Sequence, residues 1–256
     1  MQRSHIVGVL TDIDDTITSE GRLTAAAYSA LEKLQSAGLR VIPVTGRPAG
    51  WCDHIARMWP VDAVVGENGA FWMRYDKHMQ KLKTVFATPP RADRQLRLDA
   101  LAAEILAAVP GCALASDQFC RVADLAIDFC EDVDPLPRSA VDAIVRHMQN
   151  AGMHAKVSSI HVNGWFGDYD KLTTTRQMLR QEFATSLDED AQREQWVFVG
   201  DSPNDAPMFA YFGNSVGVAN VLDFADRLDA APTYITRDRA GAGFVQLAQA
   251  LLEARA

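Results

Sequence analysis

Short apolar runs alternate with amphipathic stretches through the first third of the chain. The runs at residues 6–10, 39–44 and 61–65 have the length of strands. Residues 24–37 carry apolar side chains at helical spacing, and a second helix is expected from Pro48 to about residue 58. Short apolar strands joined by helices are typical of a parallel sheet that is covered on both faces.

The middle of the chain has a different pattern. A helix followed by two strands occurs there twice, which is typical of an α+β unit. The helices are expected at about residues 93–108 and 137–151, and the strands at about 112–116, 125–129, 155–159 and 160–166. We therefore expect residues 86–164 to form an inserted domain, here called the cap, and residues 1–85 and 165–256 to form the core.

The first pattern returns after the cap. We expect a helix at about residues 172–183, a solvated loop at 188–194, strands at 196–199, 215–218 and 233–235, and a C-terminal helix from about residue 244. The predicted fold class is therefore α/β, with a Rossmann-like parallel sheet core and an inserted α+β cap.

Composition narrows the range of functions. The 256 residues are 48% hydrophobic and carry a net charge of -8, without a basic block, so nucleic acid is not an expected partner. No apolar stretch has the length of a membrane span, and no membrane partner is expected. The four cysteines lack zinc spacing and indicate reduced thiols of a cytoplasmic protein. The sequence does not indicate an oligomeric state.

An acidic cluster follows the first strand. Asp12 and Asp14 project to the same side because side chains alternate along a strand, and Asp15 lies just beyond them. Two carboxylates about 4 Å apart repel by roughly 4 kcal/mol at an effective dielectric constant near 20. The cluster indicates a compensating cation or a site that handles phosphate, whereas the simpler alternative is an acidic turn.

Polar or small residues follow two other predicted strands in the same way. They are Thr45 and Gly46 after the second strand, and Asp201 and Asp205 after the strand at 196–199. Ligands of open parallel sheets bind beyond the carboxyl ends of the strands. Carboxylate oxygens at this density suit Mg²⁺, and histidine or cysteine at zinc-ligand spacing is lacking.

These motifs resemble those of the haloacid dehalogenase superfamily, in the branch of phosphatases with a large α/β cap between the second and third motifs. Asp12–Thr16 fits the first motif, Val44–Arg47 the second, Lys171 the third and Gly200–Asp205 the fourth. The motif order covers nearly the whole chain. The chain is similar in this respect to Cof-type, sucrose-phosphate and mannosyl-phosphoglycerate phosphatases. It departs from them at Leu172, where family members often carry glycine.

The resemblance implies a role for each motif residue. Asp12 would attack phosphorus and form an aspartyl-phosphate, and Asp14 would act as general acid and base. Thr45 and the Gly46 amide would hold phosphate oxygens, while Lys171 would offset the charge of nucleophile and phosphate. The alternative for Lys171 is a surface lysine at the start of a helix.

The resemblance also implies the metal ligands. Mg²⁺ would bind Asp12, the backbone carbonyl of Asp14 and Asp201, with Asp205 as a further ligand or a support. Asn204 would orient Lys171 or a phosphate oxygen.

Contacts to the leaving group are the least defined. Glu67 and Asn68 resemble a family segment beneath the cap, although a plain turn explains them too. Arg47 is a candidate for substrate contact or for a surface ion pair. Asn163 is one of four polar candidates on the predicted cap strands, the others being His154, Lys156 and Ser158.

The sequence thus predicts a Mg²⁺-dependent phosphomonoester hydrolase for a small phosphorylated metabolite, namely a sugar phosphate or a glycosyl phosphoglycerate. A phosphotransferase of the phosphomannomutase kind would share the motifs but return the phosphoryl group to a sugar. A non-catalytic protein that binds sugar phosphates is the second alternative. The release of inorganic phosphate without a bisphosphate activator separates the hydrolase from the phosphotransferase.

Overall fold

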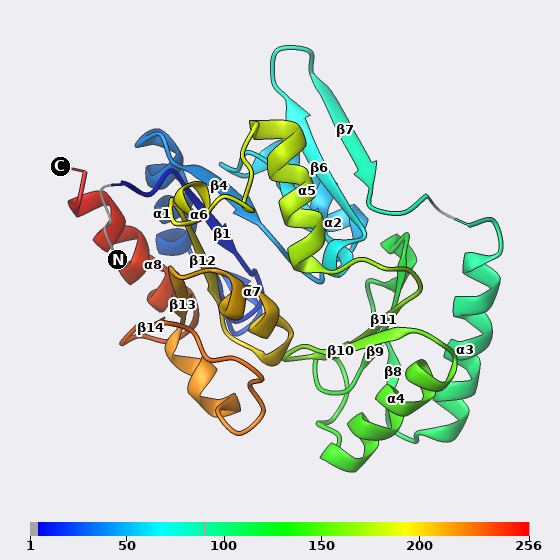
Figure 1. The fold of residues 1–256 in the computed structure, drawn as a ribbon. Coiled ribbons are helices and arrows are strands. Elements are labelled where there is room, and N and C mark those ends of the chain that lie inside the picture. Colours follow the sequence, from blue (N-terminus) through cyan, green and yellow to red (C-terminus); the bar gives the residue numbers. More distant parts are fainter. Residues whose placement is uncertain (1–4, 90, 256) are drawn as a thin grey trace.

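A parallel sheet forms the centre of the molecule (Figure 1). The computed structural model describes residues 5–89 and 91–255. The strand order is β14-β13-β12-β1-β4, and every neighbouring pair is parallel. The strands are β1 (Gly8–Thr11), β4 (Arg40–Pro43), β12 (Trp196–Gly200), β13 (Ser215–Gly217) and β14 (Tyr234–Ile235). A small antiparallel pair, β2 (Thr18–Ser19) and β3 (Arg22–Leu23), follows β1.

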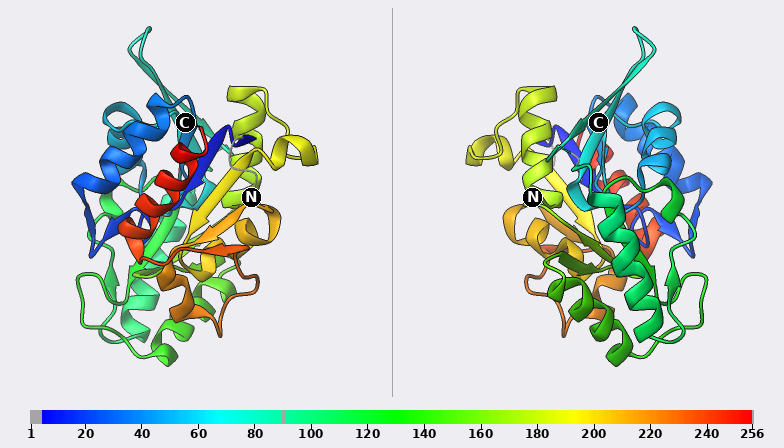
Figure 2. Two further views of the ribbon diagram at one scale, coloured as in Figure 1. Left: turned by 90° about the vertical axis from the view of Figure 1, so that its left-hand side faces the viewer. Right: turned by 90° about the vertical axis from the view of Figure 1, so that its right-hand side faces the viewer.

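Helices cover both faces of this sheet (Figure 2). They are α1 (Ala25–Ser36), α2 (Ala49–Met58), α5 (Lys171–Phe183), α6 (Asp190–Arg193), α7 (Ala206–Tyr211) and α8 (Ala240–Glu253). Side chains alternate along β1, so the strand contributes to the packing on both faces of the sheet. Val9 lies in one apolar cluster with side chains of α1 and α8, and Leu10 lies in another with side chains of α5 and α7. This two-sided burial explains why β1, β4 and β12 are mainly apolar.

A hairpin extends the core beyond β4. An isolated parallel bridge between Val44 and Val65 connects the central sheet to a three-stranded antiparallel sheet. Its strands are β5 (Val64–Gly66), β6 (Phe71–Asp76) and β7 (Lys81–Phe86). The sequence pattern did not predict β6 and β7. Charged residues such as Arg74 and Lys83 dilute their apolar content, and an antiparallel hairpin lacks the helix that marks a parallel connection.

The cap is a four-stranded antiparallel sheet with two helices. Its elements are α3 (Arg94–Ala108), β8 (Ala113–Leu114), β9 (Asp124–Asp128), α4 (Arg138–Asn150), β10 (His154–Val157) and β11 (His161–Trp165), in the strand order β10-β11-β9-β8. Alternation gives this sheet two unlike faces. Leu125, Ile127 and Val162 pack with α3 and α4 in an apolar cluster. The residues between them on the strands form the opposite, mainly polar face.

The predicted fold class is confirmed, with local corrections. Residues 190–193, expected within a loop, form the short helix α6, and α8 begins at Ala240 rather than near Phe244. Pro48 is the N-cap of α2 and not within its first turn. The cap limits at 86 and 164 stay a prediction. Among the described residues, no helix has the length and apolar character to cross a membrane.

Gly69 permits a close approach on which the start of α5 depends. Its φ is +108°, and an added Cβ would lie 2.2 Å from the carbonyl oxygen of Asp170. We expect Gly69→Ala to lower the free energy of unfolding by about 3 kcal/mol, because backbone atoms must shift. Urea denaturation measures this loss. The matched control is Gly38→Ala, where φ is +82° and the space is open, so only the cost of the left-handed backbone, about 1 kcal/mol, is expected.

Candidate active site

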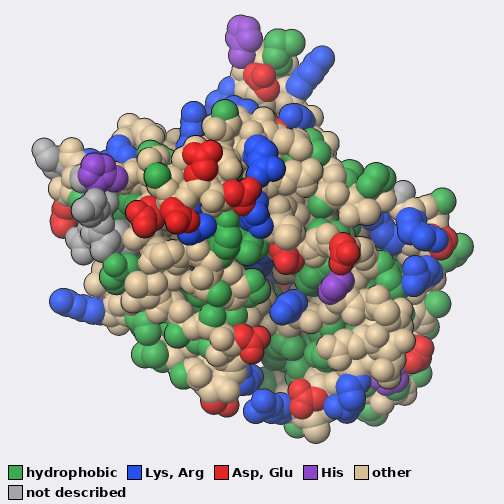
Figure 3. Space-filling view, in the orientation of Figure 1, with side chains coloured by type: hydrophobic (Ala, Val, Ile, Leu, Met, Phe, Trp, Pro, Cys, Tyr) green, Lys and Arg blue, Asp and Glu red, His purple; other side chains and the backbone are tan. Residues whose placement is uncertain are grey.

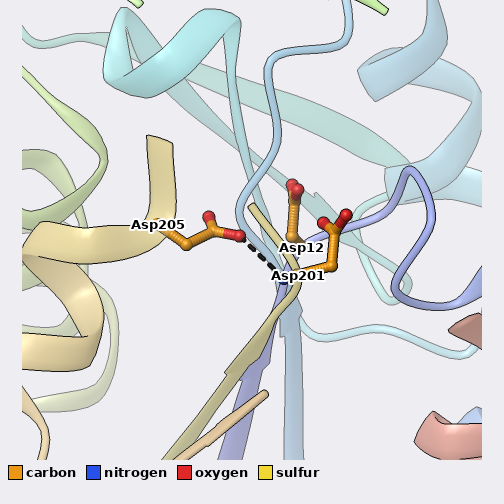
Figure 4. Close-up of side chains that lie close together, drawn as sticks. All are labelled: Asp12, Asp201 and Asp205. Atoms are coloured by element: carbon orange, nitrogen blue, oxygen red, sulfur yellow. Dashed lines mark hydrogen bonds between the residues drawn. The ribbon is translucent and has the colours of Figure 1, made fainter. Parts of the chain in front are cut away.

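Three buried carboxylates gather where β1 and β12 end (Figure 4). Asp12 follows β1, and its backbone N–H donates to the carbonyl of Val199, so the two strands hold it in place. Asp201 follows β12, and Asp205 lies in the next turn. One oxygen of each of the three side chains lies within 4.8 Å of the others. The predicted meeting of these strand ends is therefore observed.

Donors fix the two carboxylates that follow β12. Asp201 accepts hydrogen bonds from Thr16 Oγ1 at 3.1 Å and from Asn220 Nδ2 at 3.2 Å. Asp205 Oδ2 accepts the backbone N–H of Asp201 at 3.1 Å. Gly200 makes this bond possible, because an added Cβ would lie 2.3 Å from Asp205 Oδ2. Asp205 thus supports the turn that carries Asp201.

The donor set fits Mg²⁺. Its ligand atoms are carboxylate oxygens, as this hard cation prefers. Burial, followed by the charges of Asp205 and Asp12, raises the pKa of Asp201 well above its ordinary range. A dication beside Asp12 and Asp201 would relieve this cost. The Asp14 carboxylate is not part of this cluster of three carboxylates. This agrees with the resemblance, which implies that only the backbone carbonyl of Asp14 binds the metal.

Lys171 is the cation that contacts these acids. Its Nζ lies 3.1 Å from Asp12 Oδ1 and 2.8 Å from Asp205 Oδ1. Burial raises the pKa of Asp12 to about 7, against the lowering effect of Lys171. Lys171 is the first residue of α5, whose N-cap Asp170 accepts the backbone N–H of Thr173 at 2.6 Å. The capped start of this helix places the ammonium group, and Lys171 is buried rather than a surface lysine.

Asp14 is bound to Arg47. The Arg47 Nε and Nη2 atoms donate to the Asp14 carboxylate at 2.9–3.0 Å. The same guanidinium donates to two cap acids, Glu131 at 2.8 Å and Asp117 at 3.3 Å, and it lies over the ring of Trp51. Arg47 therefore joins the core to the cap, which is more than the surface ion pair considered as its alternative role.

The predicted phosphate-binding residues lie around the same strand ends. Thr45 Oγ1 accepts the backbone N–H of Arg47 at 3.0 Å, which fixes the turn after β4. The Gly46 carbonyl accepts Arg121 Nη1 of the cap at 2.9 Å. Asn204 Oδ1 accepts the hydroxyl of Ser202 at 2.8 Å.

Glu67 and Asn68 are placed differently from one another. The Glu67 carboxylate accepts backbone N–H groups from Ala49 of the core and from 122–124 of the cap, at 2.6–3.1 Å. These bonds weigh against the substrate contact that the resemblance implied for Glu67. The Nδ2 atom of Asn68 is buried without a hydrogen-bond partner among the described residues. Both residues have positive φ, at 43° and 54°.

A small cavity separates the strand ends from the cap. Its volume is about 20 Å³, which is space for about one water molecule. Asp12, Asp14 and Asn204 line it from the core, and His161 and Asn163 line it from the cap. Asn163 is fixed by its hydrogen bond to Asp124 at 3.0 Å. This closed arrangement leaves no room for a phosphate ester at that point.

Comparison with known proteins gives a family match for part of the chain. Residues 9–90 match the family model of the haloacid dehalogenase-like hydrolases. The predicted resemblance to this family is thereby confirmed over residues 9–90, and the match supports the expectation of an enzyme. No curated protein sequence matches the chain.

Solved structures match the fold of nearly the whole chain. A Thermoplasma acidophilum protein has a TM-score of 0.69 at 18% identity, with 97% of this chain and 99% of that chain covered. The sucrose-phosphatase of Synechocystis, in complex with sucrose and phosphate, has a TM-score of 0.64 at 16% identity, with 96% and 97% covered. A superfamily phosphatase from Bacteroides thetaiotaomicron has a TM-score of 0.64 at 18% identity, with 98% and 96% covered.

Glu131 gives a pH-dependent test of the joint between core and cap. Contacts with His161 and Arg47 lower the pKa of Glu131 from 4.5 to about 2. The contact with His161 is 2.9 Å long but poorly directed for a hydrogen bond. The stabilisation of the fold by ionised Glu131 is therefore complete above pH 4.5 and is lost as the pH falls toward 2. We expect Glu131→Gln to lower the free energy of unfolding by about 2 kcal/mol at pH 7 and by less at pH 3.5.

Urea denaturation at both pH values measures the difference. The matched control is Glu104→Gln, which removes an exposed glutamate–histidine contact within the cap and should change stability little at either pH. An equal loss at pH 7 and pH 3.5 for Glu131→Gln would contradict the assignment.

Proposed function

We propose that this chain is a Mg²⁺-dependent phosphomonoesterase that acts on a small phosphorylated metabolite through an aspartyl-phosphate intermediate. The observation that carries the proposal is the contact between buried Asp12 and Lys171 at the carboxyl end of the central sheet. A lysine beside the attacking carboxylate offsets the charge of an incoming phosphate dianion. The free cysteines support the expected cytoplasmic location.

The first step forms a bond between an Asp12 oxygen and phosphorus and breaks the bond to the ester oxygen. Thr45 and the Gly46 amide would hold the phosphate oxygens, and Lys171 would stabilise their charge. Bound Mg²⁺ would supply further charge neutralisation, held by Asp12, the Asp14 carbonyl and Asp201, with Asp205 in support. Asn204 would orient Lys171 or a phosphate oxygen.

Asp14 would protonate the leaving oxygen and then take a proton from the water that hydrolyses the intermediate. In the present arrangement both of its oxygens accept hydrogen bonds from Arg47, so neither is free to reach a leaving oxygen. The acid role therefore requires that this contact change when the substrate and the cap take their places. Because Arg47 also holds two cap acids, movement of the cap provides that change.

The first test is Asp12→Asn. Loss of the nucleophile should reduce turnover at least ~10³-fold, about 4 kcal/mol of transition-state stabilisation, with the fold retained. Phosphate release from p-nitrophenyl phosphate measures it, without a bisphosphate activator, and circular dichroism checks the fold. The matched control, Asp53→Asn, alters an exposed acid on α2 and should leave turnover unchanged. A variant with more than a tenth of the wild-type activity would remove Asp12 from its role.

Removal of the metal is the second test. Exhaustive chelation should abolish phosphate release, and added Mg²⁺ should restore it, because the clustered carboxylates are hard oxygen ligands. Asp201→Asn should raise the Mg²⁺ concentration needed for half-maximal activity by about 10-fold or more. Undiminished activity in chelator would show that the cluster works without a metal.

A further inference from the structure

A second, larger cavity of about 670 Å³ adjoins the strand ends. Its inner wall includes Asn68, Lys171 and Asn204 of the core, and its outer wall includes His154 and Lys156 of β10. Figure 3 shows the surface hollowed where the core meets the cap. The volume is in the range of small-molecule sites, unlike that of the closed cavity over Asp12.

The register of the cap sheet determines which β10 side chains face the core. Lys156 pairs with Asn163 across the two strands, and cross-strand partners lie on the same face. Asn163 lines the cavity over Asp12, so this face is the one turned toward the strand ends. Ala155 and Val157 alternate with Lys156 and pack into the apolar cluster under the cap helices. Lys156 therefore lies on the face of the cap sheet that is turned toward the strand ends.

Asn68 connects the large cavity to the phosphate side of the site. It lines the cavity and is 3% exposed, and its Nδ2 donor has no partner among the described residues. An added Cβ on Gly46 would lie 3.1 Å from this Nδ2, so the amide reaches the turn expected to hold phosphate. A buried amide donor without an acceptor is costly, and a ligand hydroxyl or oxygen in the cavity would satisfy it.

Some of the charged side chains that line the cavity have an ion-pair or hydrogen-bond partner, and others do not. Lys171 is paired with Asp12 and Asp205, and Asp170 is occupied at the start of α5. Asp168 is fully exposed and lies 3.8 Å from His154. Lys156 has no ion-pair partner in the parts of the chain that the structure describes, residues 5–89 and 91–255. It is thus a cation available to a ligand in this cavity.

We infer that the large cavity receives the leaving group and that Lys156 selects one with a carboxylate. This inference rests on the proposed phosphomonoesterase function and narrows its substrate class. After the cap moves to admit it, a phosphate held against Asp12, Gly46 and Lys171 would direct its ester group past Asn68 toward β10. The substrate is then a phosphorylated, hydroxyl-bearing acid such as a phosphorylated sugar acid, rather than a neutral sugar phosphate.

The experiment compares two open-chain esters that differ at one end. The probe 6-phosphogluconate carries a carboxylate where sorbitol 6-phosphate carries a neutral alcohol. We expect wild-type kcat/KM to favour 6-phosphogluconate by about 5- to 10-fold, the range of a partly exposed ion pair. Lys156→Gln should remove this preference and Lys156→Glu should reverse it. The matched control, Lys77→Gln, lies on the β6–β7 hairpin and should keep the wild-type ratio.

Two further measurements keep the inference separate from the proposed function. Hydrolysis of p-nitrophenyl phosphate should be nearly equal in wild type and Lys77→Gln, and its absence in wild type would defeat the proposed phosphatase. Calorimetric binding of both esters to Asp12→Asn, alone and combined with Lys156→Gln, reports selectivity without turnover. Equal binding of the two esters, or a preference that survives Lys156→Gln, would overturn the role of Lys156.

Discussion

The contact of Lys171 with Asp12 and Asp205 is the interaction on which the rest of the site depends. Three carboxylates share a buried space, and burial raises the pKa values of Asp12 and Asp201. Loss of one partner from a buried ion pair typically costs 3–5 kcal/mol because the other charge is left uncompensated. The Asp170 cap and the hydrogen bond from Thr174 to the Gly69 carbonyl therefore serve one purpose, which is to keep the first residue of α5 in place.

The joint between core and cap has a different character. Arg47 and Arg121 of the two parts are surrounded by carboxylates, and Glu67 takes backbone donors from the cap. Apolar packing lies mainly in the interior of each part: the cap has its own cluster under α3 and α4, and Ala123 of the cap joins the cluster of the core. A polar joint exchanges its partners for water more readily than an apolar one. Cap movement is thus compatible with a core that stays rigid.

Local patterns in the sequence predicted the central sheet and the acidic strand ends. Apolar runs identify buried strands, and the position of Asp12 at the end of such a run follows from that assignment. The sequence pattern did not predict the hairpin β6–β7, because its charged residues lie on an exposed strand. The sequence did not predict the contacts of Arg47 for another reason. Asp14 and Glu131 lie 33 and 84 residues away. The fold of the core brings Asp14 to Arg47, and the closed arrangement of core and cap brings Glu131 there.

The β6–β7 hairpin also leaves the extended sheet with an open edge at β7. Unpaired backbone groups at such an edge invite strand addition from another chain and, with it, aggregation. Lys81 and Lys83 lie on this strand, and Lys83 is bonded to Glu182 at 2.6 Å. At the opposite edge, β14 has only two residues. A charged strand at one border and a very short one at the other give this protein a built-in protection against assembling into larger β-structures.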